Sequence, residues 1–229
     1  MLAPARNRAA QDFRTTSMVS QERKDRRKRA VREEIIDAAR DIMLREGYSA
    51  LSMRRIAEAI GYAPSTLYLY FRDREEIANE LSLLGYKAFR DYLEPSTGDA
   101  DPWARLCALA KAYQRFASEY PETYRLIFMG EPKFVQAISS KRVEPTSADG
   151  QWVLEQVGAA FVQLKSSARL NTERPPHLLA ETMWLSLHGI VSMKIFYPDF
   201  PMSAPDALLD ALLEGFRHGI LKPATHGAR

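Results

Sequence analysis

The stretch ALSMRRIAEAIGYAPSTLYLYFRDREE, residues 50–76, decides the fold of the N-terminal third of this chain of 229 residues. Ser52 is a good N-terminal cap, because its hydroxyl can accept from the free amides of the turn that it opens. The apolar residues behind it predict one amphipathic helix with its stripe on Met53, Ile56, Ala57 and Ile60. Gly61 then ends this helix, since glycine tolerates the left-handed backbone of a C-terminal cap.

A second short helix follows, and its residue types are suited to DNA. Pro64 stands in its first turn, where the missing amide proton costs nothing. Leu67 and Phe71, four residues apart, are the expected inward anchors. The remaining positions carry hydroxyls and phenols, which allow a helix to enter a major groove and touch base edges and phosphates: Ser65, Thr66, Tyr68 and Tyr70.

Two short helices joined by a tight turn containing glycine form the helix-turn-helix pattern. Geometry of this kind also occurs in surface helical hairpins of all-α proteins, in which the tyrosines would be incidental. The basic run Arg23–Arg29, interrupted only by Asp25, stands upstream of the pattern. That run is either the solvated start of a helix or an arm that contacts phosphates beside the major-groove helix.

The segment from Arg32 to Leu81 resembles the N-terminal domain of the TetR family of transcriptional regulators. The resemblance lies in the strings VREEIIDAARDIMLREGYSA, MRRIAEAIGY, APSTLYLYF and RDREEIANEL. The chain departs from the usual family residues at Leu51, Ala63 and Leu69. Near the C-terminus, Trp184, His188 and Gly189, with Pro121–Leu126 upstream, are similar to the branch of the family named for a Trp-His-Gly C-terminal domain.

This resemblance implies an all-α fold in which a three-helix DNA-binding domain precedes a helical domain for ligand binding and dimerisation. It implies a homodimer formed through the last two helices of each subunit. It also implies that a small molecule displaces the fourth helix and changes the spacing of the two DNA-contacting helices. Independently, a two-fold dimer doubles the few base pairs that one helix-turn-helix contacts, through a palindromic site.

Charge and composition agree with a nucleic-acid-binding module joined to a different domain. Residues 1–72 carry 15 Lys and Arg against 9 Asp and Glu, net +6, and the remainder carries net −3. Cys107 is the only cysteine, so the chain can form no internal disulfide, and its expected role is that of a small buried hydrophobe. No signal peptide or membrane span is predicted, and cytoplasmic residence is expected.

Along the chain, the lack of periodicity predicts a disordered basic tail over residues 1–24. The helix-turn-helix domain is predicted over 25–75, where Val31, Ile35, Ala38, Ala39, Ile42 and Met43 form an apolar helical stripe ended by Gly47. Asp73 and Glu76 predict a capping box for a fourth helix. The ligand-binding and dimerisation domain is predicted over 76–222, and a flexible C-terminus over 223–229. About nine helices and no strands are expected.

No residue pattern points to catalysis, to a metal or to a cofactor. His188 lies on one helical face with Trp184, and it is either a hydrogen-bonded core histidine or a polar group lining a ligand cavity. Aromatic residues at helical spacing are equally compatible with plain core packing. The candidate ligand-binding residues are Trp103, Tyr113, Phe116, Phe128, Trp152, Phe161, Trp184 and His188.

The sequence therefore predicts a dimeric, ligand-responsive regulator that represses by binding a palindromic DNA operator and is released by a small molecule. Two alternatives stay open: a DNA-binding regulator controlled by a protein partner instead of a ligand, and a helical enzyme. Base readout is expected from Ser65, Thr66 and Tyr68. The full set of predicted DNA contacts is Ser52, Arg54, Ser65, Thr66, Tyr68, Tyr70 and Arg74, with Arg26, Arg27 and Lys28 of the arm.

Overall fold

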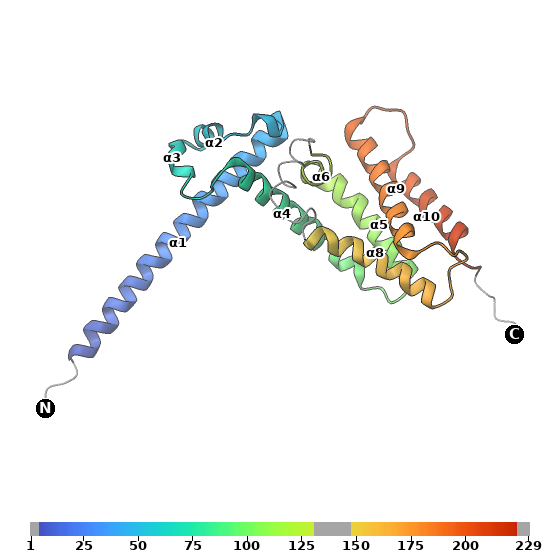
Figure 1. Ribbon diagram of the computed structural model, residues 1–229, viewed down its shortest axis with the longest axis horizontal. Coiled ribbons are helices and arrows are strands. Elements are labelled where there is room, and N and C mark those ends of the chain that lie inside the picture. Colours follow the sequence, from blue (N-terminus) through green and yellow to red (C-terminus); the bar gives the residue numbers. More distant parts are fainter. Residues whose placement is uncertain (1–4, 131–147, 224–229) are drawn as a thin grey trace. The chain divides into compact units, whose positions relative to one another are not determined.

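The computed structural model describes the backbone of residues 5–130 and 148–223, and the side chains of residues 21–130 and 148–223. Over these ranges the chain is helical with no strand, which confirms the predicted all-α fold. The described residues form nine α-helices, labelled in Figure 1, and two 3-10 helices: α1 Ala5–Glu46, η1 Tyr48–Ala50, α2 Met53–Ile60, α3 Pro64–Leu67, α4 Arg74–Leu93, η2 Glu94–Thr97, α5 Pro102–Glu119, α6 Pro121–Phe128, α8 Ala148–Ser166, α9 Pro176–Phe196 and α10 Pro205–Ile220.

The described residues fall into two compact units, one ending at Leu81 and the other beginning at Ser82. This boundary lies inside α4, whereas the sequence placed the domain boundary after residue 75, in the first turn of that helix. The first turns of α4 belong to the first unit because Ile77, Ala78 and Leu81 are buried there. The predicted flexible C-terminus lies outside the described residues from residue 224 onward.

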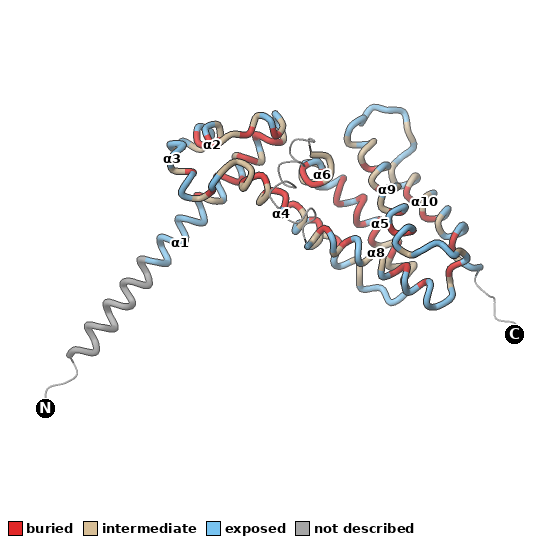
Figure 2. The backbone as a smooth tube through the Cα atoms, in the orientation of Figure 1, coloured by how far each residue is buried: buried red, intermediate tan, exposed pale blue. Residues whose placement is uncertain are grey.

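Helix α1 begins at Ala5, so the structure differs from the disordered tail predicted over residues 1–24. The reason lies in the composition, since no glycine or proline occurs between Ala5 and Glu46 and strong helix formers predominate. Residues 21–30 are exposed on every side, and burial begins at Val31 (Figure 2). A helix without an apolar stripe has no hydrophobic periodicity, and it is therefore missed by a search for periodicity.

The first unit is built around the helix-turn-helix that the sequence predicted. Its core is the expected stripe of α1, joined by side chains of α2 and of the segment after it: Val31, Ile35, Ala39, Ile42, Met43, Met53, Ile56, Ala57, Leu67 and Phe71. The Ser52 hydroxyl accepts from the Arg55 amide at 3.2 Å, and Gly61 adopts a φ of 73° at the C-terminal cap of α2. Pro64 begins α3. The predicted caps are thus confirmed.

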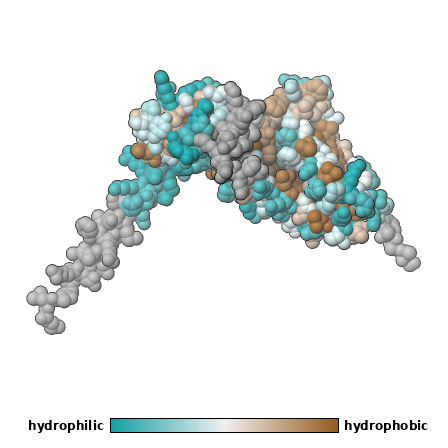
Figure 3. All heavy atoms as spheres, viewed as in Figure 1, coloured by the Kyte–Doolittle hydropathy of each residue, from teal (hydrophilic) through white to brown (hydrophobic). Residues whose placement is uncertain are grey.

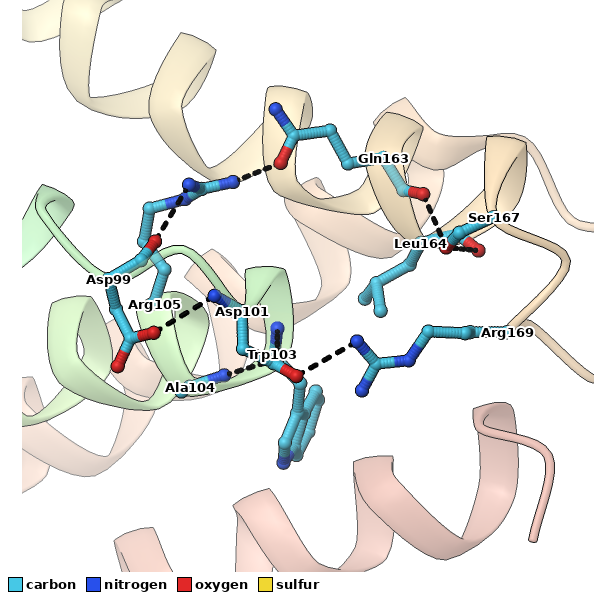
Figure 4. A network of polar contacts seen from close by, with 9 residues as sticks. All are labelled: Asp99, Asp101, Trp103, Ala104, Arg105, Gln163, Leu164, Ser167 and Arg169. Carbon is cyan, nitrogen blue, oxygen red and sulfur yellow. Dashed lines mark hydrogen bonds and ion pairs between the residues drawn. The ribbon is translucent and has the colours of Figure 1, made fainter. Parts of the chain in front are cut away.

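The second unit is a helical bundle in which α5 packs against α6, α8, α9 and α10. Asp101 caps α5 by accepting from the amides of Trp103 and Ala104, and its other carboxylate oxygen lies 2.9 Å from Arg169 after α8 (Figure 4). Arg105 links the same two segments, because it donates to the Asp99 carbonyl and to Gln163 of α8. Polar contacts therefore fix the start of α5 against the end of α8, while apolar side chains fill the middle of the bundle.

Candidate nucleic-acid interface and ligand site

The second helix of the helix-turn-helix is short, and two buried anchors fix it. Leu67 and Phe71 are 0% and 1% exposed, as predicted. The chain continues beyond α3 in a hydrogen-bonded turn, in which the amides of Tyr70 and Phe71 both donate to the Leu67 carbonyl. The other side chains of the segment are less buried: Ser65, Tyr68 and Leu69 are exposed, and Thr66 and Tyr70 are half-buried. The structure thus places the three predicted base-readout residues on one short segment.

Arg32 of α1 holds the end of this segment in place. Its guanidinium lies 4.1 Å from the centre of the Phe71 ring and donates to the Tyr70 carbonyl at 3.1 Å. The same group forms a two-pronged ion pair with Glu80 of α4. One side chain therefore joins α1, the turn after α3 and α4, a role that the planar fork of arginine allows and a lysine could not fill.

Three of the predicted DNA contacts have partners inside the protein. Arg74 donates to the Leu51 carbonyl at 2.9 Å and stacks 5.0 Å from the centre of the Tyr48 ring, so it fixes the approach to α2. Arg54 pairs with Glu58 one turn further along α2, with its side chain 81% exposed. The Ser52 hydroxyl serves as the cap described above. The guanidinium of Arg54 is therefore more open to a phosphate than that of Arg74.

The predicted arm is a continuous part of α1. Arg26, Arg27 and Lys28 are exposed and have no ion-pair partner among the described side chains. The described surface of α1 before Val31 is largely hydrophilic (Figure 3). Because unpaired cations on a helix attract an anionic surface, this part of α1 is available for phosphate contacts.

The structure gathers only half of the predicted ligand-binding residues into one cluster. Tyr113 of α5, Phe128 of α6, and Trp184 and His188 of α9 meet through ring contacts 4.8–6.0 Å between centres, with Tyr124 of α6 among them. The other four lie elsewhere. Trp152 lies under Arg90, Trp103 borders a surface groove, and Phe116 and Phe161 are buried in the bundle.

Sequence reasoning missed Tyr124, which is fully buried and central to this cluster. Tyr86 and Phe89 of α4 were missed as well, although Phe89 touches both Tyr113 and Phe128. Tyr124 carried a signal, since it lies in the Pro121–Leu126 motif quoted for the family resemblance. Helical spacing alone does not bring residues 113, 124 and 188 together, because they lie on three different helices.

A hydrogen-bonded chain runs through the cluster and fixes the tautomer of His188. Tyr113 Oη lies 2.7 Å from Tyr124 Oη, which lies 2.6 Å from His188 Nδ1. If Nδ1 carried the imidazole proton, it would donate to Tyr124, and Tyr124 would donate its hydrogen bond to Tyr113. The buried hydroxyl of Tyr113 would then have no acceptor among the described residues. Tyr113 therefore donates to Tyr124, Tyr124 donates to Nδ1, and the imidazole proton is assigned to Nε2.

Burial favours the neutral form of all three groups of this chain. It raises the pKa of Tyr113 well above its ordinary value, raises the pKa of Tyr124, and lowers the pKa of His188 from 6.5. The result is an aromatic cluster in which the hydrogen-bonded chain ends at an imidazole whose proton is assigned to Nε2. Such a group is suited to a ligand that offers a carbonyl or carboxylate oxygen.

A groove of about 1030 Å³ lies on the second unit where α8 and α10 end. Its lining combines the Trp103 ring with cationic side chains, among them Arg169, Arg217 and Lys222. Cations at the C-terminal ends of helices also complement the helix dipole. Trp103 therefore borders this groove and takes no part in the His188 cluster.

Within the described residues, no helix is long and apolar enough to cross a membrane, and no group of three or more His, Cys, Asp or Glu side chains could hold a metal ion.

Comparison with known families gives two matches that follow the two units. Residues 35–81 match the model described as bacterial regulatory proteins of the tetR family. Residues 106–216 match a tetracyclin repressor-like C-terminal domain. This C-terminal match does not confirm the more specific Trp-His-Gly branch.

Curated relatives match over part of their length. An HTH-type transcriptional regulator of Mycobacterium tuberculosis is 29% identical over 113 residues, which are 48% of this chain and 47% of the relative. Another, from Haemophilus influenzae, is 31% identical over 71 residues, which are 31% of this chain and 38% of the relative. The chain thus spans less than half the length of these relatives.

Solved structures share the fold over most of the chain. The fatty acid degradation regulator FadR of Bacillus halodurans superposes with a TM-score of 0.64 at 18% identity, over 85% of this chain and 96% of that one. The TetR family regulator PfmR of Thermus thermophilus superposes with a TM-score of 0.56 at 22% identity, over 79% and 95%.

Replacing Arg32 tests its role as the link between three segments. We expect Arg32→Lys to lower the free energy of unfolding by about 1–2 kcal/mol, because a lysine cannot form the ion-pair fork, the carbonyl bond and the ring contact together. Urea denaturation followed by circular dichroism measures this change. Arg40→Lys is the matched control, since Arg40 lies on the same helix in an exposed pair with Asp37, and it should change stability by less than about 0.5 kcal/mol. Equal effects of the two variants would contradict this role for Arg32.

The lowered pKa of His188 predicts a pH dependence of stability. Below about pH 6.5 the unfolded imidazole takes up a proton that the folded one does not, so the unfolding free energy should fall as the pH drops from 7 towards 5. The contribution of His188 to this slope is at most about 1.4 kcal/mol per pH unit. Urea denaturation at a series of pH values should show a smaller slope for His188→Gln than for the unsubstituted chain. A His188→Gln slope equal to that of the unsubstituted chain would refute the assignment.

Proposed function

The chain belongs to the tetR family of bacterial regulatory proteins, to which the matches over residues 35–81 and 106–216 assign it, and from this premise we propose that it is a ligand-responsive transcriptional repressor. The family places the chain among transcriptional regulators and not among enzymes. We propose that it binds a palindromic DNA operator as a homodimer and leaves it when a small molecule binds. The observation that carries this proposal is the exposure of Ser65, Tyr68 and Leu69 on a segment that the buried residues Leu67 and Phe71 anchor.

In this proposal the segment enters the major groove. Ser65, Thr66 and Tyr68 offer hydroxyl groups to base edges, and Tyr70 lies beside the backbone. Because Leu67 and Phe71 are buried and Arg32 fixes the Tyr70 carbonyl, these groups are held in place before DNA arrives. Arg54 and the α1 arm are the proposed phosphate contacts, whereas Ser52 and Arg74 act mainly by shaping the start of α2.

We propose that two copies associate through α9 and α10. Leu178 and Leu185 of α9 are 42% and 59% exposed, and Phe196 at the end of that helix is 60% exposed. Gly215 and Gly219 of α10 have open space where a side chain would stand, so another helix could approach closely. A two-fold axis through such a contact would present two helix-turn-helix segments to two half-sites of a palindrome.

The proposed effector site is the cluster around His188. Aromatic walls from Tyr113, Phe128 and Trp184 suit an apolar or aromatic ligand, and the Nε2 proton of His188 suits an oxygen acceptor on it. Release requires the ligand to favour the conformation that does not bind DNA. Moving the population from 1:99 to 99:1 takes about 5.5 kcal/mol of differential affinity. The Trp-His-Gly branch remains part of this proposal, because Trp184 and His188 stack on each other.

The test of this function is selection of binding sequences from random duplex DNA, with the full chain at near-physiological salt. We expect a palindromic consensus. Tyr68→Ala should weaken binding to it at least tenfold, because alanine cannot reach the base edge, while the thermal midpoint stays within about 2 °C since Tyr68 is 58% exposed. Tyr68→Phe removes only the hydroxyl group, so it measures the contribution of that group to DNA binding. Loss of folding in Tyr68→Ala would contradict the role assigned to Tyr68, and enrichment without a consensus would contradict sequence-specific binding.

The arm is tested by the salt dependence of DNA binding. Replacing Arg26, Arg27 and Lys28 with alanine should weaken binding to specific and random duplexes alike. It should also reduce the slope of log K against log salt by about 0.9 for each phosphate that the arm no longer neutralises. Anisotropy titrations at several salt concentrations measure the slope. The matched control is the triple variant of Lys111, Arg115 and Lys165, which are exposed on the second unit. An equal effect of the two variants would rule out phosphate contacts by Arg26, Arg27 and Lys28.

A further inference from the structure

Leu69 is the most exposed large apolar side chain among the described residues. It is 74% exposed, compared with 60% for Phe196 and 59% for Leu185. It also differs from the residues usual in the family at this position. A large aliphatic side chain in water next to an otherwise polar surface calls for a physical explanation.

The exposure of Leu69 does not come from a loose backbone. The Leu69 amide donates to the Thr66 carbonyl at 3.1 Å, and the Tyr70 amide that follows donates to Leu67 at 2.9 Å. Leu67 and Phe71 are anchored in the core on either side. Leu69 is therefore held outward by the same contacts that hold Tyr68.

The surroundings of Leu69 exclude an ordinary protein interface. Its exposed neighbours along the chain are Ser65, Tyr68 and Arg72, and of these only Tyr68 adds apolar surface, so the exposed apolar area on this segment is small. Protein interfaces need a far larger contiguous area than this. In the major groove, by contrast, the base edges offer a single apolar group, the C5-methyl group of thymine.

We propose that Leu69 recognises a thymine in each operator half-site by packing its side chain against the C5-methyl group. This inference rests on the proposed DNA-binding function and adds a base preference to it. Tyr68 and Ser65 supply hydrogen bonds on the same segment, and Leu69 supplies the contact that hydrogen bonds cannot make. The contact discriminates thymine from cytosine, whose C5 position carries no methyl group.

The experiment replaces the thymines of the selected consensus one at a time with deoxyuridine, which lacks only the methyl group. Each replacement is made symmetrically in both half-sites, and Kd is measured by anisotropy with the full chain. One symmetric replacement should weaken binding of the unsubstituted chain by about fourfold per half-site, which corresponds to about 0.8 kcal/mol for a buried methyl-sized group. The two half-sites together should give about a sixteenfold effect, since the two free energies add.

Leu69→Ala should bind the thymine duplex more weakly and should no longer respond to deoxyuridine at the same position. Leu69→Met, of similar volume, should retain the sensitivity. Leu154→Ala is the control, because Leu154 is an exposed leucine of α8 in the second unit, and it should leave both affinities unchanged.

The outcomes separate this inference from the proposed function. A consensus that contains no methyl-sensitive thymine, or a Leu69→Ala variant that keeps the full sensitivity, would overturn the role of Leu69 and leave the DNA-binding function standing. Enrichment without any consensus would overturn both.

Discussion

A helix of four residues cannot maintain its own position, and this constraint governs the first unit. Isolated helices shorter than about 12 residues are marginal in water, so α3 depends on contacts with the rest of the domain. Leu67 and Phe71 supply the apolar part of these contacts, and Arg32 supplies the polar part through the Tyr70 carbonyl and Glu80. These contacts hold the exposed side chains of the segment in place.

The second unit meets a related constraint, since its aromatic core contains polar atoms that must all be paired. Tyr113 and Tyr124 are buried, and a buried hydroxyl proton without an acceptor costs about 1–3 kcal/mol. The hydrogen-bonded chain satisfies both protons only if His188 accepts at Nδ1. The packing of α5 and α6 thereby determines which nitrogen of the α9 imidazole carries the proton.

The sequence predictions that the structure confirms rest on local signals. Ser52, Gly61 and Pro64 act through the backbone within one turn of themselves, so a single sequence is enough to place the helix-turn-helix. Periodicity failed for residues 21–30 of α1, because a helix exposed on every side has none. Contacts between distant elements were equally inaccessible: Arg74 donates to Leu51, 23 residues away, and Tyr124 meets His188 at a separation of 64 residues. For the same reason, the eight candidate ligand-binding residues lie in several separate parts of the second unit instead of in one site.

The division between anchored and exposed residues has a consequence for specificity. Ser65, Tyr68 and Leu69 contribute little to the core, so changing them alters what the surface can contact at a small cost in stability. Leu67, Phe71 and Arg32 have the opposite character, since their replacement would move the whole segment. In a two-fold dimer each exposed contact acts twice, so a modest gain per half-site is squared in the binding constant. A domain of this kind can change the sequence it prefers through a few side chains without changing its fold.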